Sequence, residues 1–72
     1  MIPSTDPLIQ KLIDKLTDDD PRVRRNAAGA LRLHGRRAVA AVPALETLLL
    51  DADMAVRREA ERALDRLRTA AA

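Results

Sequence analysis

The side chains best suited to catalysis or metal binding are few in this sequence. His34 is the single histidine, Gly35 follows it, and there is no cysteine. One histidine without a thiolate cannot build a zinc site, and general acid–base catalysis needs carboxylates gathered in a pocket. We therefore expect a non-catalytic protein with no cofactor and no metal site. We expect His34 to pack against its neighbours or to cap a helix end.

Arginine is the functional group that recurs. Eleven of the 13 basic residues are arginine, and 11 acidic residues leave a net charge of +2. A guanidinium can bind a carboxylate or a phosphate through two parallel hydrogen bonds. Five arginines on the predicted solvent side of two helices are our candidate partner-binding residues: Arg22, Arg25, Arg32, Arg58 and Arg62. The alternative is a solvated helix face held by ion pairs, such as Glu59 with Arg62 and Asp65 with Arg68.

Length and composition limit what can hold this chain together. The 72 residues, taken as one domain over 1–72, contain no Phe, Tyr or Trp, so the core must be Leu, Ile, Val and Ala. A core this small gives marginal stability, which favours oligomerisation or stacking on further units. The first six residues do not resemble a signal peptide, and no apolar stretch is long enough to span a membrane. These features predict a cytoplasmic protein.

The sequence repeats itself after 33 positions. The two matching sets are Leu12, Leu16, Asp18, Asp20, Val23, Arg24, Arg25, Ala27, Ala30, Leu31 and Leu45, Leu49, Asp51, Asp53, Val56, Arg57, Arg58, Ala60, Ala63, Leu64. Repeat 1 covers about residues 6–35 and repeat 2 about residues 36–69. Repetition at this period is typical of a solenoid, in which each unit must stack on a neighbour to bury its apolar face.

Apolar periodicity and start signals predict helices at about 7–17, 21–34, 42–50 and 54–69. Asp6-Pro7 and Asp20-Pro21 each place a capping residue before a proline in the first helical turn, and Gly35 suits the end of the second helix. Pro43 means that the third helix either starts near Val42 or is kinked there. We expect the alanine tail after residue 69 to fray. The predicted fold is all-α, with four helices in two stacked antiparallel hairpins.

These repeats resemble HEAT repeats, of the short type found in bacterial HEAT-like and phycobilisome-lyase-type proteins. The resemblance lies in Val42-Pro43-Ala44-Leu45, Leu49, Asp51, Asp53, Val56-Arg57, Ala60, Ala63 and Leu64, and in their counterparts in repeat 1, where Gln10 replaces Pro43. It implies an α-solenoid that serves as a binding scaffold. It also implies a structural ladder across the repeat junction, with Asp51 bound to Arg24 or Asp18 bound to Arg57.

Comparison of the repeats also indicates a self-association surface. Leu48 and Leu50 replace Lys15 and Thr17, and no third repeat covers the last helix. The candidate self-association residues are Leu48, Leu50, Leu64 and Leu67.

Gly29 lies in the middle of a predicted helix, at the position where repeat 2 has Arg62. A glycine there is explained either by tolerated variation or by close approach of a partner backbone.

The leading functional hypothesis is a protein-interaction scaffold that self-associates and binds a protein partner, for which an acidic protein is the candidate. A first alternative is weak binding of nucleic acid or another anionic partner through the arginines. Nucleic acid is disfavoured because the chain has no aromatic residue on which bases could stack. A second alternative is a piece of a longer HEAT-repeat protein.

Overall fold

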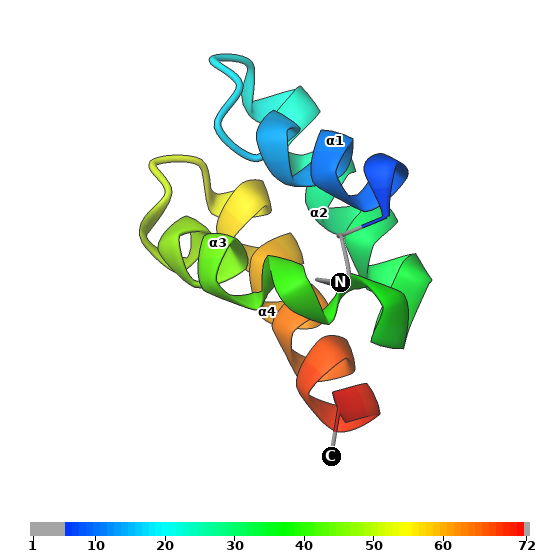
Figure 1. Cartoon of the computed structure of the whole chain (residues 1–72). Coiled ribbons are helices and arrows are strands. Elements are labelled where there is room, and N and C mark those ends of the chain that lie inside the picture. The colour runs from blue at the N-terminus through cyan, green and yellow to red at the C-terminus, as the bar shows by residue number, and fades with distance from the viewer. Residues whose placement is uncertain (1–5, 72) are drawn as a thin grey trace.

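The computed structural model of the protein describes residues 6–71, and the expectations for residues 1–5 and 72 lie outside these residues. The elements run in the order α1 (Pro7–Lys15), α2 (Pro21–His34), η1 (Gly35–Ala41), α3 (Val42–Thr47), η2 (Leu48–Leu50) and α4 (Met54–Ala71), where η marks a 3₁₀ helix (Figure 1). The described part contains no strand, so the prediction of an all-α fold is confirmed. None of its helices combines the length and the hydropathy that a membrane span requires.

Aspartates start three of the helices. The Asp6 Oδ1 atom accepts the Leu8 N–H at 2.8 Å before α1, and Asp20 Oδ1 accepts the Arg22 N–H at 2.9 Å before α2. Asp53 Oδ1 accepts the Val56 N–H at 3.0 Å in the first turn of α4. These carboxylates satisfy N–H groups that have no partner within the helix, which is why each helix begins at that point.

The third helix differs from the prediction. The helix expected over about 42–50 begins at Val42 as predicted, but it is α-helical only to Thr47 and continues as the 3₁₀ segment η2; the 3₁₀ segment η1 precedes it. Pro43 lies in the first turn of α3, where its missing N–H removes no intrahelical hydrogen bond. The expected α-helical end near residue 50 is therefore wrong, because the α-helix ends at Thr47. The helix α4 continues through Ala71, beyond the expected end near residue 69.

The core lies where α4 meets the rest of the chain. The helix α2 packs against both α1 and α4, and η1, α3 and η2 all pack against α4. The core is entirely aliphatic, with Leu31, Leu45, Val56 and Leu67 each fully buried. Alanines on α2 and α4 are also buried, and their small side chains let the two helices approach closely. This α2–α4 contact joins repeat 1 to repeat 2.

Gly35 ends α2 as expected. Its φ is +57°, which a residue with a Cβ rarely adopts, and it is buried where α2 gives way to η1. The turn at Gly35 lets η1 fold back against α4.

Candidate functional site

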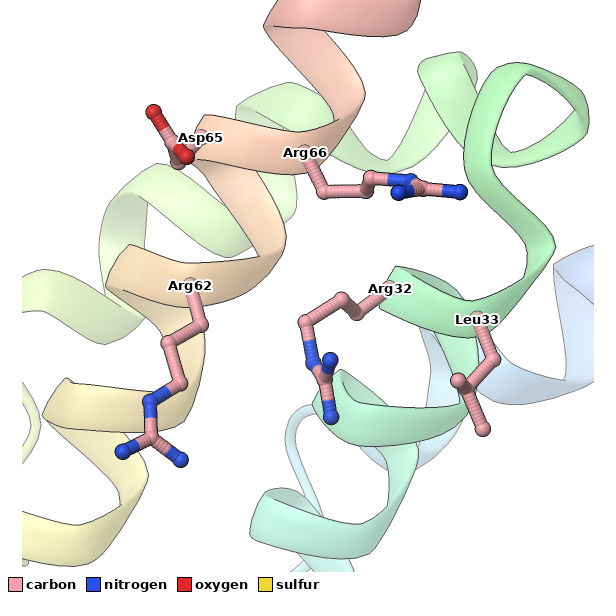
Figure 2. A pocket seen from close by; sticks show the side chains of 5 residues that line it. All are labelled: Arg32, Leu33, Arg62, Asp65 and Arg66. Atoms are coloured by element: carbon pink, nitrogen blue, oxygen red, sulfur yellow. The ribbon is translucent and has the colours of Figure 1, made fainter.

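A shallow groove of about 340 Å³ lies between the C-terminal halves of α2 and α4. Its lining residues are Arg32, Leu33, Arg62, Asp65 and Arg66. In Figure 2 the side chains of Arg32 and Arg62 point toward the same end of the groove, and Arg66 reaches from α4 toward α2. Asp65 points away from these guanidinium groups. The groove therefore presents three cations that come from two helices.

The hollow continues along the N-terminal halves of the same two helices. Arg25 and Glu59 line two neighbouring depressions there, one of which also contains Arg58 and Arg62. These depressions share lining residues, and we call the three together the α2–α4 groove. Its charged lining residues are Arg25, Arg32, Arg58, Arg62, Arg66, Glu59 and Asp65. Five arginines against two carboxylates make it a cationic surface.

Glu59 holds part of this surface in place. Its carboxylate accepts a hydrogen bond from Arg32 Nε at 2.8 Å and lies 3.8 Å from Arg62 Nη1. The Glu59 side chain is only 14% exposed. A Cβ added at Gly29 would lie 3.4 Å from Glu59 Oε2. The space beside Gly29 is therefore occupied by Glu59 at an ordinary contact distance, so Glu59 does not require a glycine at this position.

Large apolar side chains lie along the same groove. Leu33 on α2 is 77% exposed and Met54 at the start of α4 is 55% exposed, and both line it. Exposed apolar groups beside cations suit a ligand that has both apolar and acidic side chains.

The structure brings four of the five candidate partner-binding arginines to the α2–α4 groove: Arg25, Arg32, Arg58 and Arg62. Arg22 is separate, because its Nε and Nη2 atoms bind the Asp20 carboxylate at 3.2 and 3.0 Å. The Arg22 guanidinium holds the pKa of Asp20 below its ordinary value. Sequence reasoning missed Arg66, although its position four residues after Arg62 places it on the same helix face.

The ion pair predicted between Asp65 and Arg68 does not form in the part of the chain that the structure describes. Arg68 instead donates to Glu46 on α3 at 2.6 Å, so this bond joins α4 to α3. Pairing within one helix was predicted from sequence spacing, whereas the tertiary packing offered Arg68 an acceptor on a neighbouring helix.

Of the four predicted ladder residues, Arg24 and Asp51 bind each other, whereas Asp18 and Arg57 do not. Arg24 Nε and Nη2 donate to the Asp51 carboxylate at 2.8 and 3.0 Å, and Arg24 Nη1 donates to the main-chain oxygens of Asp18 and Asp19. The Arg24 hydrogen bonds hold the pKa of Asp51 below its ordinary value. Asp18 and Arg57 are not brought together. Arg57 Nη1 donates to the main-chain oxygen of Asp51 at 2.6 Å.

Three of the four candidate self-association leucines are corrected by the structure. Leu48 is 6% exposed, Leu64 2% and Leu67 0%, whereas Leu50 is 89% exposed. We expected the last helix to lack a cover, but η1, α3 and η2 pack on α4 from within the same chain. Only Leu50 remains accessible to a partner.

His34 lies half-buried at the end of α2, beside a hollow shared with Arg36 and Arg66. In residues 6–71 no group of three or more His, Asp or Glu side chains is placed to hold a metal ion.

Helix pairs packed through alanine-rich faces, with an arginine–aspartate bond across the junction, define a helical-repeat protein of the solenoid class. A family model described as HEAT repeats matches residues 9–72, so the chain belongs to the HEAT-repeat family. The matched model describes HEAT repeats in general and does not distinguish the phycobilisome-lyase type from others. Comparison with curated proteins and with solved structures gave no match.

Proposed function

We propose that this chain is a non-catalytic protein-interaction module that binds an acidic protein segment in the α2–α4 groove. HEAT repeats generally mediate contacts between proteins, which supports the class of function. The observation that carries the proposal is the gathering of five arginines from α2 and α4 along one groove with only two carboxylates. Guanidinium groups bind carboxylates in bidentate geometry, so a Glu- or Asp-rich segment is the matching ligand.

A protein segment fits this surface better than nucleic acid does. The chain has no aromatic side chain on which bases could stack. Leu33 and Met54 offer contacts that apolar side chains of a peptide can fill but a phosphate backbone cannot.

Fluorescence anisotropy with a labelled peptide of alternating glutamate and leucine tests the groove. The double variant Arg62→Gln/Arg66→Gln should weaken binding by about tenfold or more, because two charge-assisted contacts are lost. The matched control is Lys11→Gln/Lys15→Gln, which removes the same charge from exposed positions on α1. The control should bind nearly as well as the unaltered chain.

Equal weakening in both double variants would mean that net charge alone attracts the peptide, and it would overturn the groove as the site. A 20-base-pair DNA duplex serves as the second probe. Duplex binding that is tighter than peptide binding and falls steeply with salt would favour the nucleic-acid function instead.

We also propose that the module associates with copies of itself. Solenoids generally need about three stacked repeats for independent stability, and this chain has two. For location we propose the cytoplasm, since a chain without cysteine suits a reducing compartment.

A further inference from the structure

The loops that precede α2 and α4 are built alike. Asp18 Oδ1 accepts the Asp20 N–H at 2.8 Å, and Asp51 Oδ1 accepts the Asp53 N–H at 2.9 Å. Both loops lie on the same side of the molecule, coloured cyan and yellow in Figure 1. Each aspartate therefore directs one carboxylate oxygen into its own loop and leaves Oδ2 for another partner.

The arginines that follow the two loops are also held alike. Arg24 Nη1 donates to the main-chain oxygen of Asp18 at 2.7 Å, and Arg57 Nη1 donates to that of Asp51 at 2.6 Å. In each case the donor lies six residues after the acceptor. This bond fixes one nitrogen of the guanidinium and leaves the Nε–Nη2 edge to face a carboxylate.

Within residues 6–71, only one of these two arginine edges is occupied. The Nε–Nη2 edge of Arg24 binds Asp51 across the junction between the repeats. For the same edge of Arg57, residues 6–71 supply no acceptor, and for Asp18 Oδ2 they supply no donor. The ladder thus ends in a cation on repeat 2 and in an anion on repeat 1, and the two ends are complementary in charge and geometry.

Apolar residues beside the two open ladder ends are also more exposed than their counterparts at the internal junction. Val56 and Ala63 of α4 are fully buried at the junction, but their counterparts Val23 and Ala30 on α2 remain partly exposed. At the other end, Leu16 of repeat 1 is 1% exposed, whereas its counterpart Leu49 is half-buried. Each end therefore leaves partly open the kind of surface that the internal junction closes.

We propose that copies of this chain stack head to tail, with the Nε–Nη2 edge of Arg57 in one copy binding the Asp18 carboxylate of the next. This rests on the self-association included in the proposed function and gives it a geometry. The interface joins two different surfaces, so stacking repeats the internal junction and leaves a free end at each side. A short open array follows rather than a closed two-fold dimer.

One residue keeps this contact weaker than the internal junction. Glu61 is exposed on α4 at the position where α2 has Ala28, which is fully buried. Stacking would bring the Glu61 carboxylate into an apolar interface, which costs free energy. The variant Glu61→Ala restores the junction residue and should tighten stacking.

Sedimentation velocity of the full chain from about 10 μM to 1 mM tests the proposal, a range suited to weak association. The unaltered chain should gain mass with concentration, and Glu61→Ala should do so at lower concentration. Asp18→Asn keeps the oxygen that accepts the Asp20 N–H but loses the charge, and Arg57→Met keeps an unbranched stem. Each should weaken stacking by about tenfold.

Mixing Asp18→Asn with Arg57→Met distinguishes this geometry from others. The first variant keeps Arg57 and the second keeps Asp18, so one intact junction forms and growth stops at a 1:1 dimer. Asp19→Asn and Arg58→Met are the controls, because they remove the same charges from exposed neighbouring side chains. Circular dichroism verifies that every variant is folded.

Association that is unaffected by either substitution, or a mixture that forms no dimer, would overturn head-to-tail stacking and leave self-association standing. An unaltered chain and a Glu61→Ala variant that both stay monomeric at 1 mM would overturn both. The open ladder ends would then belong to a repeat of another polypeptide. Peptide binding in the α2–α4 groove is measured separately, so its failure is not confused with either result.

Discussion

Arg24 and Asp51 form a bidentate ion pair across the junction between the two repeats, with nitrogen–oxygen distances of 2.8 and 3.0 Å. The Arg24 side chain is 16% exposed and the Asp51 side chain 8%. A charge-assisted pair that is largely shielded from water contributes more than an ordinary surface salt bridge. Because Arg24 lies on α2 and Asp51 in the loop before α4, the pair ties the two repeats together at their junction.

Asp51→Asn should lower the free energy of unfolding by about 2 kcal/mol, because it leaves Arg24 without its anion. Arg24→Met should cost more, since it also removes the bonds to the main-chain oxygens of Asp18 and Asp19. Urea unfolding of both variants and of the double variant measures the coupling. Strict additivity of the two losses would contradict a direct interaction.

Acid should remove the contribution of Asp51. The folded-state pKa of this carboxyl lies below its ordinary value because of the Arg24 hydrogen bonds. Its stabilisation is complete above the unfolded-state pKa of about 3.9 and is lost as the pH falls through the lower folded-state pKa. The Tm difference between the unaltered chain and Asp51→Asn should thus be constant near neutral pH and shrink below about pH 4. A difference unchanged down to pH 2 would contradict this assignment.

Gly29→Ala should stabilise the protein by about 0.5–1 kcal/mol, since alanine is the better helix former and Gly29 lies inside α2. The added Cβ meets Glu59 at 3.4 Å, an ordinary contact. Thermal unfolding should show a Tm a few degrees higher. The matched Gly35→Ala should lower Tm, because Gly35 has a φ of +57°. A lower Tm for Gly29→Ala would mean that the Glu59–Arg32 pair was disturbed.

Leu48 and Leu50 should respond differently to the same substitution. Leu48→Ala removes a side chain that is 6% exposed and should cost about 2–4 kcal/mol, a large share of the stability of so small a protein. Leu50 is 89% exposed, so Leu50→Ala should change stability by less than about 0.5 kcal/mol. Urea unfolding of the two variants measures both values. Similar losses would contradict the placement of η2 against α4.

Much of the fold was predictable because its signals are local. The capping roles of Asp6 and Asp20 and the turn at Gly35 follow from backbone groups within a few residues. The exact course of the third helix was not predictable. Pro43 disfavours an α-helix on its N-terminal side but does not decide between a loop and the 3₁₀ segment η1, which is selected by packing on α4.

The sequence by itself determined the repeat, the helix starts, the all-α class and the residue types that could bond across the junction, because these depend on spacing and local hydrogen bonding. Tertiary structure alone decided which leucines are buried and which ladder ends stay open. It also decided that Glu59 lies beside Gly29 and that Arg66 joins the α2–α4 groove. These relationships are distant in sequence, and the packing of α2 against α4 brings them together.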